Sequence, residues 1–125
     1  MDVGWAEHDF AKVYQYGCNA NAPNQQWRKV EKGGGWMLLQ NKNSGKCLDV
    51  LAGALNDGAQ IIQYNCHGGA SEQWRMLPRG GGGWYILQNK RSSKCLDVEV
   101  GRTSSGARVH QWGCHNGTNQ LFRLQ

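Results

Sequence analysis

The fold is decided by two stretches that repeat each other: residues 33–77 read GGGWMLLQNKNSGKCLDVLAGALNDGAQIIQYNCHGGASEQWRML, and residues 81–125 read GGGWYILQNKRSSKCLDVEVGRTSSGARVHQWGCHNGTNQLFRLQ. They align without a gap, 48 residues apart, and 22 of the 45 paired positions are identical. A fixed period of this kind is typical of structural units that cannot bury a hydrophobic face alone and therefore share one core.

The first part of the chain holds a third, less similar copy. Residues 11–18 align with residues 59–66 at the same spacing of 48, and residues 24–28 match residues 71–75 after one inserted residue. We therefore predict a single domain over the whole chain, with repeats at about residues 1–32, 33–80 and 81–125.

The first repeat is predicted to be truncated or degenerate, because the counterparts of residues 36–40 and 46–47 would fall before Met1. A barrel of three repeats is then short of strand material, with unpaired backbone groups beside the gap. We expect either a modified closure by residues 1–10 or a strand borrowed from a second molecule in a strand-swapped homodimer.

Short apolar runs between glycine-rich and polar segments indicate strands. Four are predicted in each full copy, at residues 36–40, 46–50, 60–64 and 73–77 and again at 84–88, 94–98, 108–112 and 121–124. The glycine runs at 33–35 and 80–83 do not open a helix with a Gly-Lys-Ser/Thr sequence, so they are interpreted as hinges between copies and not as phosphate-binding loops.

Composition excludes several classes of protein. Only 39% of the 125 residues are apolar and 18 are glycine, which argues against a helical bundle. No apolar run is long enough for a membrane span, so no membrane insertion is expected. The net charge of +5 comes from Lys and Arg spread along the chain, which does not favour nucleic acid as a partner.

The five cysteines are explained by the repeat. Cys47 and Cys66 are 19 residues apart, Cys95 and Cys114 are also 19 apart, and Cys18 is left over. No Cys-x-x-Cys occurs, and the histidine directly after each second cysteine is poorly placed to share a zinc ion with it. We therefore predict two disulfides, no metal, and a secreted, extracellular protein.

Three short patterns recur in phase: Cys-Leu-Asp-Val, aromatic-x-Cys, and Gln-x-Trp or a variant of it, as at residues 47–50, 64–66 and 25–27. With them the chain resembles the ricin B-type, or R-type, carbohydrate-binding β-trefoil over essentially its whole length. The resemblance implies an all-β β-trefoil with pseudo-threefold symmetry. It also implies one shallow sugar site per repeat, built from the Asp of Cys-Leu-Asp-Val, the aromatic residue before the second Cys, and the Asn-Gln before the core Trp.

The family's sugar-binding residues carry over unevenly. The third repeat supplies Asp97, Trp112, Asn119 and Gln120. The second supplies Asp49 and Tyr64 but has Ser71 and Glu72 where Asn and Gln are expected. The first supplies Tyr16, Asn24 and Gln25.

These residue types suit a sugar for physical reasons. A flat aromatic ring matches the apolar face of a pyranose, while a carboxylate and an amide accept from and donate to the hydroxyls at its edge. An ionised Glu72 only accepts hydrogen bonds, as does the neighbouring Asp49, so we expect the third site to bind most strongly. We expect a shallow surface site of this kind to have a dissociation constant near 1 mM, which is a binding free energy of about −4 kcal/mol. Several such sites on one chain raise the avidity for a polymer.

Structural interpretations compete with these roles. The two aspartates also suit a turn cap, and Tyr64 and Trp112 also suit a core position. The remaining expectations are structural: core positions for Trp27, Trp74 and Phe122, and surface-loop positions for His67, His110 and His115. Gln15, Gln63 and Gln111 hold one equivalent position, which fits a strand-to-strand hydrogen bond as well as a ligand contact.

The expected function is carbohydrate binding without catalysis and without a cofactor. Glycoside hydrolysis needs two facing carboxyl groups, whereas the chain offers about one aspartate per repeat. The resemblance implies galactose-type sugars or plant polysaccharides such as xylan or arabinan as partners, and a targeting module of a secreted glycoside hydrolase or a small lectin. The alternative is a protein-binding β-trefoil, an inhibitor or interaction domain that binds no sugar.

Overall fold

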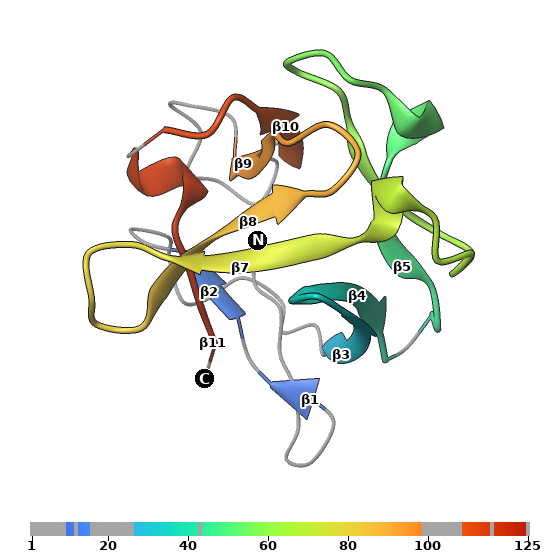
Figure 1. Cartoon of the computed structure of the whole chain (residues 1–125), viewed down its shortest axis with the longest axis horizontal. Coiled ribbons are helices and arrows are strands. Elements are labelled where there is room, and N and C mark those ends of the chain that lie inside the picture. The colour runs from blue at the N-terminus through green and yellow to red at the C-terminus, as the bar shows by residue number, and fades with distance from the viewer. Residues whose placement is uncertain are drawn as a thin grey trace.

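The computed structural model describes residues 10–11, 13–15, 27–42, 44–98, 109–115 and 117–124. Within them, eleven antiparallel strands form one sheet (Figure 1). The first copy contributes β1 (Phe10–Ala11), β2 (Val13–Gln15) and β3 (Trp27–Gly33). The second contributes β4 (Trp36–Asn41), β5 (Cys47–Val50), β6 (Ile61–Tyr64) and β7 (Trp74–Pro78). The third contributes β8 (Trp84–Asn89), β9 (Cys95–Val98), β10 (Val109–Trp112) and β11 (Phe122–Leu124).

The strands predicted for the second and third copies are confirmed, each boundary within one residue. Short 3-10 turns precede the last strand of each of these copies, η2 (Ala70–Glu72) before β7 and η3 (Thr118–Gln120) before β11. A further turn, η1 (Leu51–Gly53), follows β5. No helix in these parts of the chain is long and apolar enough to cross a membrane.

Glycine turns join successive copies, as the sequence predicts. β3 pairs with β4, and β7 pairs with β8, so each hairpin crosses a repeat boundary. Gly33 to Gly35 and Gly80 to Gly83 all have φ between 66° and 93° in these turns. Side chains disfavour this left-handed region, which is why both turns consist of glycine.

One hydrophobic core is shared by all three copies. Its largest members, Trp27, Trp74 and Phe122, hold one position in each copy and are fully buried, which confirms their predicted core role. Smaller residues recur in the same way, with Leu48 and Leu96 equivalent. The arrangement is the β-trefoil that the resemblance implies, with the core at the pseudo-threefold axis.

The first copy differs from its predicted alignment. β1 pairs with β3 and β2 pairs with β11, so Gln15 lies opposite Phe122 as Asn41 lies opposite Trp27 (Figure 1). β1 and β2 together therefore take the place of β4 in their repeat, so the alignment of residues 11–18 with 59–66 is wrong for these strands. Their position is set by the pairing that closes the sheet and not by a weak local similarity. The sheet is closed by residues of the same chain, and of the predicted closing segment, residues 1–10, the structure describes Phe10.

Both predicted disulfides are present. Cys47 is bonded to Cys66 and Cys95 to Cys114, with Cα atoms 5.2 Å and 5.1 Å apart. Each joins the first residue of a buried strand to the loop after the paired strand. Two disulfides in a chain of this size are consistent with an oxidising, extracellular compartment.

Candidate functional site

The Cys-Leu-Asp-Val strands place one carboxylate in each of the two full repeats. Because side chains alternate along a strand, Leu48 and Val50 of β5 face the core while Asp49 faces the disulfide side. Asp97 holds the same position in β9. Only 4% of Asp49 and 2% of Asp97 is exposed, so both carboxyl groups lie beneath the surface and not on its rim. In the described part of the chain, neither aspartate accepts a hydrogen bond from a backbone N–H as a turn cap would.

Asp97 is surrounded by hydrogen-bond donors. Its Oδ1 accepts from Asn119 Nδ2 at 2.9 Å and from His110 Nε2 at 3.0 Å. Its Oδ2 accepts from Gln120 Nε2 at 2.8 Å, and His115 Nε2 lies 3.4 Å away. The predicted residues Asp97, Asn119 and Gln120 therefore do come together, but as a network in which they bind one another.

Gln120 lies behind the carboxylate and is fully buried. Its Nε2 also donates to the Gly113 carbonyl at 3.0 Å, and its Oε1 accepts from the His115 backbone N–H at 2.9 Å. The amide thus links Asp97 to the loop that carries the second cysteine of the repeat. This geometry fits a residue that positions Asp97 better than one that touches a ligand.

The second repeat keeps the same frame but loses three donors. Ile62 faces Asp49 across the β5–β6 ladder, where His110 faces Asp97. Ser71 replaces Asn119, and Glu72 replaces Gln120. What remains is His67 Nε2, 3.1 Å from Asp49 Oδ2, while Asp49 Oδ1 has no hydrogen-bond partner in the described part of the chain.

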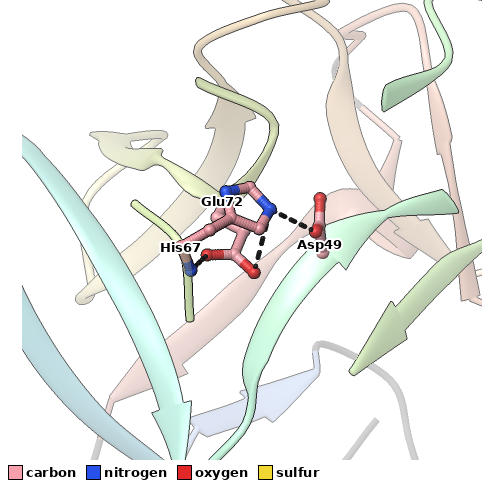
Figure 2. A group of neighbouring side chains, drawn as sticks. All are labelled: Asp49, His67 and Glu72. Carbon is pink, nitrogen blue, oxygen red and sulfur yellow. Dashed lines mark hydrogen bonds and ion pairs between the residues drawn. The ribbon is translucent and has the colours of Figure 1, made fainter. Parts of the chain in front are cut away.

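Glu72 is fully buried beside Asp49 and His67, as Figure 2 shows. Its Oε1 accepts from the backbone N–H groups of His67 at 2.8 Å and Gly68 at 3.1 Å. Its Oε2 is 3.4 Å from His67 Nε2 and has no hydrogen-bond partner among the described residues. Burial raises the pKa of Glu72, the two backbone donors oppose that rise, and the Asp49 charge adds to it.

The surface-loop prediction is right for His67 and His115 and wrong for His110, which lies in β10 with a side chain only 12% exposed. The two loop histidines nevertheless face the aspartates of their sites. Gly69 N–H donates to His67 Nδ1 at 2.9 Å, and Gly117 N–H donates to His115 Nδ1 at 2.8 Å. With Nδ1 acting as an acceptor, the proton of the neutral ring is on Nε2, which faces the aspartate. A Cβ at Gly69 would lie 2.8 Å from Nδ1, so the contact requires glycine there. The recurring Cys-His-x-Gly was the signal that could have revealed it.

Asp49, His67 and Glu72 also have the chemistry of divalent-cation ligands, with one ligand atom from each lying within 4.8 Å of the other two. The tautomer of His67 does not fit this role. A ring that binds metal through Nε2 carries its proton on Nδ1 and donates it to an acceptor. Here Nδ1 already receives the Gly69 N–H.

Two aromatic side chains lie at the surface above the carboxylates. Tyr64 is 52% exposed and Trp112 is 44% exposed, so a core role for either is wrong. Tyr64 meets the His67 ring edge-on with centroids 6.1 Å apart, and Trp112 lies 5.6 Å from the His110 ring. Beside Tyr64, an open pocket of about 380 Å³ is lined by Asp49, Val50, Leu51, Ala52, Gly53, Ile62, Tyr64, His67 and Ser71.

A loop of the second repeat forms a wall of the third site. Gln111 is fully buried and its Nε2 donates to the carbonyls of Ala54 and Asn56 at 2.9 and 3.0 Å. Next to it, Asp57 Oδ1 accepts from the Gly113 N–H at 2.9 Å. Lys94 Nζ, 2.9 Å from the same oxygen, lowers the pKa of Asp57.

The equivalent glutamine in the second repeat, Gln63, is exposed and accepts from Ser44 Oγ at 2.7 Å. Gln111 keeps the matching bond from Ser92 Oγ at 2.8 Å. Both glutamines therefore make structural hydrogen bonds. The first-repeat candidates Tyr16, Asn24 and Gln25 lie outside the described residues.

The sequence profile of the ricin-type beta-trefoil lectin domain-like family matches residues 1–64, 23–112 and 70–125. No curated protein sequence gives a significant match.

Solved structures with similar folds include a designed three-fold symmetric protein, ThreeFoil. It is 44% identical over 85% of this chain and 75% of its own, with a TM-score of 0.78. An exo-beta-1,3-galactanase from Clostridium thermocellum is 27% identical with a TM-score of 0.86; the match covers 96% of this chain but 30% of the enzyme. The Polyporus squamosus lectin shares the fold at 17% identity, with a TM-score of 0.73 over 98% of this chain and 50% of its own.

Proposed function

This chain belongs to the ricin-type β-trefoil lectin domain-like family, and from that premise we propose that it is a carbohydrate-binding module with one weak sugar site in each full repeat. The proposed ligands are galactose-type sugars or a plant polysaccharide such as xylan or arabinan. Similarity to the exo-beta-1,3-galactanase, which is 27% identical to this chain, favours galactosides.

One observation carries the proposal. In both repeats an exposed aromatic ring, Tyr64 or Trp112, belongs to the strand that pairs with the strand of a buried aspartate, and a half-exposed histidine, His67 or His115, lies within 3.4 Å of that aspartate. Such a ring provides a platform for the apolar face of a sugar, and the polar groups beside it contact the hydroxyls. The other large aromatic side chains whose burial the structure describes are buried or half-buried.

Within each site we assign two kinds of role. Trp112 and Tyr64 are the contact residues, together with the edge of the imidazole and, in the third repeat, the Asn119 amide. Gln120 and Glu72 are buried and do not contact the sugar; they position the carboxyl groups of Asp97 and Asp49. A sugar hydroxyl that reaches Asp97 has to share an oxygen with a donor already bound there, whereas Asp49 has acceptor capacity to spare.

We propose no catalysis. Asp49 and Glu72 form a carboxyl pair that the one-aspartate-per-repeat prediction did not include, and two carboxyl groups are the machinery of glycoside hydrolysis. Glu72 is fully buried, and the same His67 Nε2 atom contacts both carboxyl groups, so the two groups do not face a glycosidic bond from opposite sides.

The deciding experiment is a binding screen of the purified chain against immobilised galactans, xylan and arabinan, with soluble galactose and lactose as competitors. We expect millimolar binding to single sugars and tighter binding to a polymer that both sites engage. Trp112→Ala is the matched control, because the ring is exposed and its loss leaves the core intact. Binding to no sugar at high density would instead support the protein-binding β-trefoil.

Secretion and attachment to a glycoside hydrolase belong to the same proposal. Light scattering tests the strand-swapped homodimer: because β1 and β2 pair with strands of the same chain, we expect a monomeric mass, and a dimeric mass would support strand exchange.

A further inference from the structure

The second site holds more negative charge than its donors can satisfy. Asp49 and Glu72 are both more than nine-tenths buried, and the side chain that donates to them is His67 with one N–H. Two oxygens, Asp49 Oδ1 and Glu72 Oε2, have no hydrogen-bond partner in the described part of the chain. Buried acceptors without donors are costly, and a second buried negative charge is costlier.

The third repeat shows what is missing. Gln120 and Glu72 use Oε1 in the same way, accepting the backbone N–H of the histidine after the second cysteine. The second terminal atom differs: Gln120 Nε2 donates to the aspartate at 2.8 Å, whereas Glu72 has an oxygen, Oε2, in that place. A hydrogen atom on Oε2 would restore the donor.

We propose that Glu72 is a positioning residue held as the neutral carboxylic acid, whose Oε2–H donates to Asp49 as the Gln120 amide donates to Asp97. One carboxyl oxygen of Asp49 and one of Glu72 lie within 4.8 Å of each other, so the acid form requires the two side chains to move closer to reach hydrogen-bond distance (Figure 2). The terminal torsion of a glutamate side chain is soft. The proton turns two competing carboxylates into a donor–acceptor pair.

The groups around Glu72 act on its protonation state in both directions. β5 contributes the Asp49 carboxylate, and the loop before η2 contributes His67 in its Nε2–H form. β8, which packs against η2, contributes the Asn89 amide, whose Nδ2 donates to the Ser71 carbonyl. Burial is the largest effect and raises the pKa of Glu72, as does the Asp49 charge; the backbone N–H groups of Gly68 and His67 and a charge on the His67 ring lower it, and the net direction is upward.

Regulation of the second site follows, and this step rests on the proposed function. When Glu72 ionises, the two carboxylates repel and Asp49 loses its support, so sugar binding at the second site weakens as pH rises. The third site has Gln120 in the place of Glu72, and an amide side chain does not ionise.

The test uses the ligand-free chain, so that it does not depend on any sugar. Glutamate side chains are labelled with ¹³C at Cδ, and the Glu72 resonance is assigned by its absence in Glu72→Gln. We expect its titration midpoint to lie clearly above the ordinary glutamate value of about 4.3. We also expect Asp49→Asn to move the midpoint back toward that value, because the neighbouring charge is removed.

A midpoint at or below the ordinary value would overturn the proposal, as would an unchanged midpoint in Asp49→Asn. Stoichiometric retention of Zn²⁺ by the wild type, lost in Glu72→Gln, would also overturn it by showing that a metal ion takes the place of the proton. If the midpoint is raised but no sugar binds at any pH, the protonation proposal stands and the sugar-binding proposal fails.

Discussion

The second and third repeats place the same aspartate on the same strand beside the same disulfide, yet the two carboxylates have different surroundings. Among the described residues, Asp97 accepts three hydrogen bonds and has a fourth donor at 3.4 Å, while Asp49 accepts one hydrogen bond, from His67. Three substitutions account for this difference, at residues 62, 71 and 72. A repeat therefore preserves its backbone frame while the chemistry of its site changes.

The largest expected effect on the free energy of unfolding comes from replacing the two aspartates. Asp97→Ala removes the acceptor of one N–H of the buried Gln120 amide and of the hydrogen bonds from Asn119 and His110, which costs about 3 to 4 kcal/mol. Asp49→Ala is expected to cost about 1 kcal/mol, because its partner among the described residues is the half-exposed His67 ring, which can bond to water instead. Urea denaturation of both variants measures the difference, and equal losses would contradict the contrast between the two networks.

The disulfides should instead behave alike. Both close loops with a sequence separation of 19, so replacing either pair by serine is expected to cost about 3 kcal/mol in the chain-entropy picture. Thermal unfolding of Cys47→Ser/Cys66→Ser and Cys95→Ser/Cys114→Ser compares them. If the two losses of stability differ by well over 1 kcal/mol, the two disulfides do not contribute equally to the stability of their repeats.

Making the second site like the third should stabilise the protein, and more so at high pH. Because the pKa of Glu72 is raised on folding, the native state binds more protons than the unfolded chain above about pH 4.5, so stability falls as pH rises through the folded pKa. Glu72→Gln removes this loss and adds a donor to Asp49, a gain of about 1.5 kcal/mol at pH 8. Denaturation curves at pH 5 and pH 8 check it, and a pH-independent difference between variant and wild type would contradict it.

The two exposed aromatic rings allow the sites to be compared by their sugar affinity. Trp112→Ala and Tyr64→Ala should each weaken sugar binding at their own site by about tenfold, or 1.4 kcal/mol, with little change in stability because both rings are about half exposed. Titration calorimetry with galactose or the best ligand of the screen measures this. Loss of both sites from one substitution would show that the two sites are not independent.

The smallest effect concerns the turn after β4 and its counterpart after β8. Gly45 has φ of 70°, and at the equivalent position Ser93 has φ of 62°. Serine is strained in this left-handed region, so Ser93→Gly is expected to be neutral to stabilising by less than about 1 kcal/mol, while Gly45→Ser costs about 1 kcal/mol. Thermal unfolding distinguishes the two signs, and a loss in Ser93→Gly would mean that the serine side chain has a role of its own.

The sequence by itself determined the strands, the turns and the disulfides of the second and third repeats. These follow from local signals that the repeat doubles: glycine runs where φ is positive, alternating apolar residues in Cys-Leu-Asp-Val, and cysteines at equal spacing. It also indicated which aspartates and aromatics gather in each site, because the family pattern fixes their positions.

Only the tertiary structure decided how those residues are used. The partners of Asp97 come from β10, η3 and the loop between them, so their convergence depends on how strands distant in sequence pack. The same holds for β2, whose place beside β11 is set by closure of the sheet and not by its local sequence. Burial, too, is a property of the whole fold, and burial is what separates the exposed rings from the aspartates beneath them and gives Glu72 its unusual environment.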